Sequence, residues 1–270
     1  MRREARKVAA TSRRPSLGVP WIGFAAVAAV WAGAMPSAAS PLETIAPESF
    51  DVEIAAVRNA YNDVRVPNEG GTDISLTDDL EASSARCFRL RLEWELSERS
   101  QLSALIAPLR IASAGRPASV VDFAGVRYPA GARIEARYQF DSYRLTYRYA
   151  LHRGRRWEID VGATAKIRDA KILFESQELG SQTTDTGFVP LLHVRAGYRF
   201  HPGWRLLFEA DALAAPQGRA EDVFVGGQYV ATPHLSVRGG YRLLEGGADV
   251  DQVYNFALIH YASLGFTYTF

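Results

Sequence analysis

The feature that most constrains this chain is a strict alternation of apolar and polar residues, which recurs along most of its length. In residues 88–96 every even position is a large apolar residue and every odd position is charged. Successive side chains of a β-strand point to opposite faces, so this period predicts a strand with one apolar and one charged face. The pattern returns in residues 134–151, as one strand in two parts (134–140 and 143–151), and in 157–167, 192–200, 204–212, 223–229, 235–243 and 256–270.

Two weaker runs, residues 52–66 and 101–111, bring the expected number of strands to ten, or eight if neither forms a strand of the sheet. Connections between the runs alternate in length. Short ones fall at 97–100, 152–156, 201–203 and 230–234, and long ones at 67–85, 112–133, 168–187, 214–221 and 245–252. Short turns at one end and long loops at the other are typical of membrane barrels. We therefore expect an all-β, antiparallel, up-and-down transmembrane β-barrel over residues 40–270.

One irregularity interrupts the alternation near Asp141. Residues 134–140 place their apolar side chains on even positions, whereas the next apolar face begins at Tyr143. An extra residue in one strand of an antiparallel pair would shift the phase in this way. The sequence therefore predicts a β-bulge at this point.

The first 39 residues have a different character from the rest. They carry six basic residues and one acid, and residues 15–41 are uncharged. A basic start, an apolar centre and the small residues Ser37 and Ala39 predict a signal peptide cleaved after Ala39. The alternative is an uncleaved membrane anchor. Removing residues 1–39 leaves 25 basic and 29 acidic residues, a net charge of −4, so no basic surface is expected to attract nucleic acid.

Alternation alone does not tell a membrane barrel from a soluble, lipocalin-like carrier, which would place its apolar face inside. The positions of the large aromatic residues favour the membrane. All three tryptophans after residue 39 lie within a few residues of short turns, and other aromatic residues share that level. Such residues gather at membrane interfaces. The predicted aromatic girdle consists of Trp94, Tyr149, Trp157, Phe200, Trp204, Tyr229, Tyr268 and Phe270.

The last strand carries the one specific resemblance. Residues 264–270 alternate apolar or aromatic side chains with Gly and Thr and end on Phe270. This strand resembles the C-terminal signal that the barrel-assembly machinery reads in bacterial outer-membrane proteins. The resemblance implies export through the periplasm to the outer membrane, with membrane lipid and lipopolysaccharide as surroundings. Ten strands is also the number in omptin-type proteases, an analogy of fold only.

If the apolar face meets lipid, the charged face lines the lumen. Barrels of about eight strands are filled by side chains, so opposite charges in a ten-stranded barrel are expected to pair across the interior. The sequence predicts a plugged barrel or a narrow passage. The expected lumen charges are Arg89, Arg91, Glu93, Glu95, Arg144, Arg148, Asp160, Lys166, His193, Arg195, Arg199, Glu209, Asp211, Arg238 and Arg242.

Two groups of residues are candidates for chemistry. Asp249 and Asp251 in the last long loop, with His260 in the following strand, could activate water or bind a divalent cation. A solvated polar turn is the favoured explanation, since the alternation turns His260 toward lipid. His193 and the charges around it could form a proton relay or simply a salt-bridge network. The sequence shows no nucleophile, zinc, P-loop or dinucleotide motif, so we expect no metal and no cofactor. Cys87 is the only cysteine, which excludes an internal disulfide.

These observations favour an outer-membrane barrel of structural or narrow-channel type with a charge-filled lumen, rather than an enzyme. The alternative is an outer-membrane hydrolase or lipid-modifying enzyme with its Asp/His site at the extracellular mouth.

Overall fold

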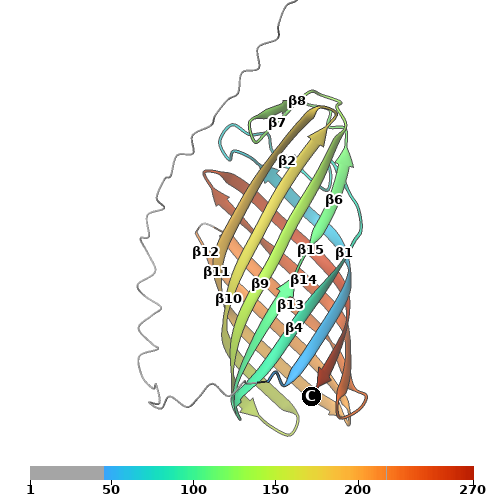
Figure 1. Cartoon of the computed structure of the whole chain (residues 1–270), viewed down its shortest axis with the longest axis vertical. Coiled ribbons are helices and arrows are strands. Elements are labelled where there is room, and N and C mark those ends of the chain that lie inside the picture. Colours follow the sequence, from blue (N-terminus) through green and yellow to red (C-terminus); the bar gives the residue numbers. More distant parts are fainter. Residues whose placement is uncertain (1–45, 217) are drawn as a thin grey trace, which may run out of the picture. The chain divides into compact units, whose positions relative to one another are not determined.

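The computed structural model describes residues 46–216 and 218–270, which form a closed antiparallel barrel (Figure 1). Ten strand positions make the ring, because β5 and β6 occupy one position together. The order closes through the pairing of β15 with β1 and of β10 with β9. The strands are β1 (Ser49–Arg65), β4 (Ala85–Ser97), β5 (Ser100–Ala107), β6 (Arg110–Gly115), β9 (Ile134–Arg153), β10 (Trp157–Ser176), β11 (Leu179–His201), β12 (Trp204–Ala215), β13 (Gly218–Val230), β14 (Leu235–Val250) and β15 (Val253–Thr269).

The ring confirms the predicted ten-stranded barrel, and the two weak runs are both part of it. The predicted signal peptide, residues 1–39, lies outside the described residues. Residues 46–216 and 218–270 contain no helix that is long and apolar enough to cross a membrane.

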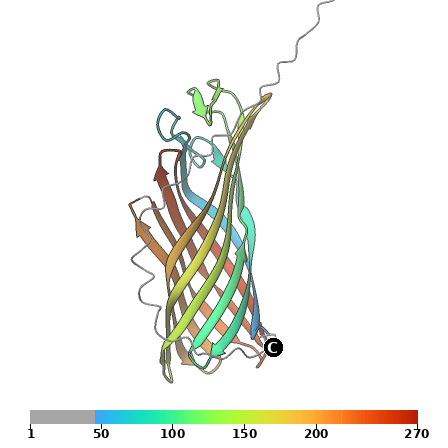
Figure 2. The ribbon, with the colours of Figure 1, turned by 60° about the vertical axis from the view of Figure 1, so that its left-hand side comes forward.

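Three of the expected long loops are wrong. β10 and β11 continue to a connection of two residues, 177–178, and rise above the rest of the ring (Figure 2). β14 and β15 are likewise joined by residues 251–252, and β12 and β13 by residues 216–217. Only the segments after β1 and after β6 are long. They carry β2 (Ile74–Ser75), β3 (Glu81–Ala82) and the hairpin of β7 (Val121–Phe123) and β8 (Val126–Tyr128).

The expected β-bulge at Asp141 is also wrong. β9 pairs with β10 in unbroken register from Glu135 to Ala150, and its pairings with β5 and β6 share one register. Even-numbered side chains of β9 point inward on both sides of Asp141, where Tyr138 and Arg144 are both buried. The strand therefore keeps its phase, and the chemistry of its inner face changes from apolar to charged. The predicted bulge is absent because the apolar residues of 134–140 line the interior, whereas the apolar residues from Tyr143 onward face lipid.

The outer surface carries a belt of exposed apolar side chains around the ring. Exposed apolar surface of this extent marks contact with a membrane. The belt includes Ile54, Phe88, Ile106, Tyr143, Leu145, Ile167, Phe188, Leu192, Leu206, Phe208, Val225, Tyr241, Leu264 and Phe266.

Above the belt the polarity inverts, and the barrel interior becomes an apolar core. We call this region the apolar cap: the buried residues of segment 66–84 and of β7–β8, with the inward side chains of β6, β9 and β10 that cover them. Phe123 stacks on Phe174 with ring centroids 4.0 Å apart. The Tyr128 hydroxyl donates to the Phe174 carbonyl at 3.2 Å and lies 2.7 Å from the Ser181 hydroxyl. The cap closes the long-loop end from within.

The outward face of the same hairpin is polar, as expected for a surface in water. The Arg127 guanidinium donates to the Asp122 carboxylate at 2.9 Å, and this contact holds the pKa of Asp122 below its ordinary value.

Candidate functional site

The lower interior of the barrel, between the short-turn end and the apolar cap, holds a network of buried charges that reaches across the lumen. We call it the ionic layer and define it by the side chains of Asp51, Glu53, Arg89, Arg91, Glu93, Arg144, Arg148, Lys166, His193, Glu209, Asp211, Asp222, Arg238 and Arg242. They come from strands on every side of the ring, because each strand alternates an inward charge with an outward apolar residue.

Asp222 on β13 is the centre of this network. Its carboxylate lies 3.2 Å from the Arg89 guanidinium, 2.6 Å from that of Arg144 and 2.6 Å from that of Arg242. β4, β9 and β14 supply the three arginines, so one carboxylate joins four strands. All four side chains are almost fully buried.

Glu53 on β1 is a second centre. It accepts hydrogen bonds from Arg242 at 3.0 Å and from Arg238 at 2.7 Å, and its side chain is 1% exposed. Arg238 also pairs with Asp51. Since Arg242 contacts both Glu53 and Asp222, the two centres are linked through a shared guanidinium.

His193 belongs to a third group around Asp211. The Asp211 carboxylate accepts hydrogen bonds from the Thr164 hydroxyl at 2.7 Å and from Arg144 at 2.8 Å, and it lies 2.8 Å from His193 Nδ1. The other ring nitrogen, Nε2, is buried and has no hydrogen-bond partner among the described residues. The contact with Asp211 fixes the orientation of the imidazole ring through Nδ1.

Lys166 differs from the arginines around it. Its side chain is 2% exposed, yet it makes no ion pair or hydrogen bond with any residue that the structure describes. Its Nζ lies 4.8 Å from the centroid of the Phe140 ring, a cation–π contact. Lys166 is therefore a buried amine without an ion-pair partner in the described part of the chain.

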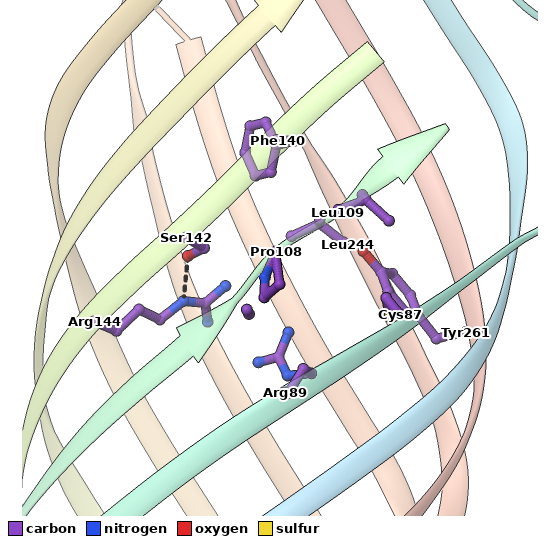
Figure 3. Close-up of a pocket in the computed structure, with 10 residues that line it drawn as sticks. Cys87, Arg89, Pro108, Leu109, Phe140, Ser142, Arg144, Leu244 and Tyr261 are labelled. Carbon is purple, nitrogen blue, oxygen red and sulfur yellow. Dashed lines mark hydrogen bonds between the residues drawn. The ribbon is translucent and has the colours of Figure 1, made fainter. Parts of the chain in front are cut away.

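A small pocket lies where the ionic layer meets the apolar cap (Figure 3). Its cavity volume is about 10 Å³, roughly what a single water molecule needs. Arg89 and Arg144 form its charged side, with the Arg144 Nε donating to the Ser142 hydroxyl at 3.0 Å. The remaining lining residues are Cys87, Ala107, Pro108, Leu109, Phe140, Leu244 and Tyr261.

Comparison with known proteins agrees with this architecture. No family model and no curated protein matches the chain. Solved structures do match. The outer membrane protease OmpT from Escherichia coli is 13% identical, with a TM-score of 0.50 over 84% of this chain and 99% of OmpT. The chain folds as a bacterial outer-membrane β-barrel.

Two further barrels are similar at lower scores. The COG4313 outer membrane channel from Pseudomonas putida F1 is 13% identical, with a TM-score of 0.45 over 86% of this chain and 100% of that one. Ail, the attachment invasion locus protein of Yersinia pestis, is 12% identical, with a TM-score of 0.36 over 83% and 100%. At these identities the likeness extends to the fold alone.

The outer-membrane barrel places most of the predicted lumen charges in its interior. Glu95 and Arg199 lie instead at the short-turn rim, where both are exposed and Arg199 pairs with Glu158 at 2.9 Å. Asp160 is buried beside Arg153, and Arg195 is half-buried. The remaining predicted charges all belong to the ionic layer.

The three candidate catalytic residues are not brought together. Asn68 donates to Asp249 at 2.6 Å, and the backbone of the same asparagine bonds the Asp251 carbonyl. His260 lies on the outer face, where its Nδ1 is hydrogen-bonded to the Tyr241 hydroxyl. Asp249 pairs with Tyr254, six residues from His260 along β15, which corresponds to about 20 Å at roughly 3.3 Å per residue. An Asp–His couple cannot form across this distance.

The predicted girdle residues lie at the short-turn end with their side chains outward. Trp157 and Trp204 are exposed. These two tryptophans each pack against a neighbouring tyrosine, with ring centroids 4.7 Å apart for Trp157 and Tyr198 and 4.8 Å for Trp204 and Tyr229.

Sequence reasoning missed the two centres of the ionic layer, Glu53 and Asp222. Both lie at the margins of the expected strands: β1 begins three residues before residue 52, and β13 extends five residues before residue 223. The signal was present in β1, where Ser49, Asp51 and Glu53 alternate with apolar residues.

Proposed function

We propose that this chain is a structural barrel of the bacterial outer membrane whose lumen is closed to solutes. The observation that carries the proposal is the contact of Asp222 with three arginines from three other strands, which joins strands across the lower interior. The apolar cap fills the interior above this level, and the pocket between the two has a volume of only about 10 Å³. A hydrated ion would have to break both layers to pass.

The outer surface supports a place in the outer membrane. The apolar belt would face the hydrocarbon region, and the aromatic girdle at the short-turn end would lie at the periplasmic interface. Arg58 and Arg86 are exposed on adjacent strands just above the belt, and neither has an ion-pair partner among the described residues. Their guanidinium groups could bind phosphates of outer-leaflet lipid or lipopolysaccharide.

The last strand and the predicted export signal complete the proposal. β15 pairs along its whole length with β14 and β1, so its aromatic residues complete the ring. We expect the barrel-assembly machinery to recognise this strand through Phe270, after removal of residues 1–39 in export.

The geometry does not favour the enzymatic alternative. OmpT is a protease, but a likeness of fold does not carry its activity. In this chain Asp249 and Asp251 lie at the end of the β14–β15 hairpin, far from His260. The Asp–His couple of the predicted hydrolytic site at the mouth therefore does not form.

Single-channel recording of the refolded chain, residues 40–270, in a planar bilayer tests the closed lumen. Heat-modifiable gel mobility serves as the folding control. We expect a folded barrel without discrete conductance steps. Reproducible, ion-selective openings from folded protein would replace the closed barrel with a narrow channel lined by the arginines of the ionic layer.

A further inference from the structure

The barrel wall contains a seam between β4 and β6. β4 pairs with β5 only as far as Leu90 and Ile106, and no strand pairing joins residues 85–89 to residues 108–111 in the described chain. Above the seam the wall resumes, where the Ser83 amide donates to the Ala112 carbonyl at 2.8 Å and β3 pairs with β6. Pro108 lies in the seam and has no amide hydrogen with which to continue the ladder.

The seam lies at the upper boundary of the apolar belt. Phe88 and Ile106 flank its lower end and are 46% and 49% exposed on the outer surface. Arg86 and Arg110, which flank its upper end, are also exposed. This succession from apolar to basic side chains places the seam at the junction between acyl chains and headgroups of the outer leaflet.

The pocket lies directly behind the seam and takes lining residues from both of its sides. Cys87 and Arg89 come from β4, and Pro108 and Leu109 come from the interruption between β5 and β6 (Figure 3). Leu244 and Tyr261 add apolar surface, while Arg144 joins Arg89 on the charged side. A molecule reaching the pocket would therefore meet hydrocarbon and guanidinium groups together.

Lys166 gives the pocket its chemical preference. Its ammonium contacts the ring of Phe140, a lining residue, and lacks any acidic partner among the described residues. Arg89 and Arg144 already share Asp222 with Arg242. Asp211 is likewise taken up by Arg144 and His193, so neither buried acid pairs with Lys166. A buried cation without an ion-pair partner is unfavourable until an anion reaches it.

We infer that the seam and pocket form a lateral binding site for the anionic head of a single-chain amphiphile, a carboxylate or phosphate on an alkyl chain. The head would pair with Lys166, and the chain would leave through the seam between Phe88 and Ile106 into the outer leaflet. The present cavity is too small for the head, so residues 85–89 and 108–111 must separate to admit it. No strand pairing joins the two segments across the seam, while each keeps its hydrogen bonds to its other neighbour, β1 or β9. The inference rests on the proposed place in the outer membrane.

Cys87 supplies a reporter, because it is the only cysteine of the chain and lines the pocket. The experiment measures the rate of Cys87 alkylation by N-ethylmaleimide in barrels folded into zwitterionic lipid nanodiscs. We expect dodecyl phosphate and dodecanoate to slow alkylation by about tenfold, as a charge-assisted contact with Lys166 would require. Dodecanol and inorganic phosphate should leave the rate unchanged.

Lys166→Met should abolish protection by both amphiphiles. Lys171→Met is the matched control, because Lys171 lies on the same strand with its side chain outward in the raised part of β10. Heat-modifiable mobility verifies the fold of each variant. If Lys166→Met does not fold, the four probes on the unmodified chain still decide the question.

Three results would overturn the inference. Equal protection by dodecanol would remove the role of the anionic head. Protection by inorganic phosphate would show an anion site reached from water rather than from the membrane. An absence of protection by any probe in correctly folded barrels would remove the site. None of these results depends on whether the lumen conducts ions, so the closed-lumen proposal stands or fails separately.

Discussion

The two halves of the barrel interior are filled by side chains of opposite character, charged in the lower half and apolar in the upper half. In the lower half the wall faces lipid, so the polar side chains point inward and are satisfied by one another, as around Asp222. In the upper half the wall faces water, so the inward side chains are apolar and pack as a core, as where Phe123 stacks on Phe174. The solvent outside the wall determines what fills the interior, although the strands keep one phase throughout.

The two halves also differ in which parts of the chain their side-chain contacts connect. The ionic layer links strands of the ring to one another, whereas the apolar cap fixes the inserted segments 66–84 and β7–β8 onto the wall. Substitutions in the ionic layer should therefore lower the stability of the whole ring. Substitutions in the apolar cap should release segment 66–84 or β7–β8 from the wall.

The largest effect is expected from Asp222→Asn. The substitution leaves the arginines on β4, β9 and β14 with one fewer buried anion, which should lower the free energy of unfolding by about 3–5 kcal/mol. Urea titration in detergent micelles, followed by tryptophan fluorescence, measures the change. The control is Glu135→Gln, whose exposed pair with Arg133 should contribute less than about 1 kcal/mol. Equal stability of the two variants would contradict the ionic layer as a link between strands.

Phe123→Ala is expected to come next and to act locally. Loss of a buried phenylalanine costs about 3 kcal/mol or more, here in the docking of β7–β8. Limited proteolysis should then cut residues 116–133 while the barrel keeps its heat-modifiable mobility. Val120→Ala, at an exposed position beside the same hairpin, should leave cleavage unchanged. Unfolding of the whole barrel together with the hairpin would show that the halves are not separable.

A double substitution asks whether the lower half must be ionic. Arg91 and Glu209 form a bidentate pair across the lumen, with Arg91 Nη1 donating at 3.2 Å. Replacing both with Met and Leu should change the free energy of unfolding by less than about 1.5 kcal/mol, because packed apolar residues can replace a buried ion pair. Glu209→Leu alone leaves Arg91 with only the longer contact to Glu93 at 3.8 Å, and the same urea titration should show a clearly larger loss of stability. A double variant as unstable as the single one would show that charge itself is required.

The smallest effect is expected from Tyr128→Phe. Removing the hydroxyl deletes its hydrogen bond to the Phe174 carbonyl and its contact with Ser181, a loss of about 1 kcal/mol. Hydrogen exchange of the β7–β8 amides, compared with those of β12, measures whether the change stays within the cap. Faster exchange in both places would contradict a local role.

The lower half could be predicted from the sequence, and the upper half could not. In residues 88–96 the two faces can be assigned from the sequence, because the apolar side chains face lipid and the charged side chains face the interior. Residues 134–140 obey the same period with the faces exchanged, and nothing local shows where the membrane ends. The long hairpin of β10 and β11 was missed for this reason, since Ile172 and Phe174 are apolar but point inward.

The candidate site depends on a different kind of information. Alternation placed Arg89, Arg144 and Arg242 in the lumen, but which acid they share depends on how ten strands close into a ring. Pro108 indicated an interruption, yet only the register of its neighbours shows that the interruption becomes a seam in the wall.

The ionic layer has a consequence for the order of assembly. Glu53 and Arg242 are 189 residues apart in the chain, and Asp51 and Arg238 are 187 apart. These partners meet only when the first strand of the ring reaches the last ones, so every partly closed sheet carries unmatched charges toward its future interior. Such an intermediate should be less stable than the finished ring, because its inward charges lack their partners. Closure should therefore be all-or-none, and it should be slow, because contacts between distant segments form late.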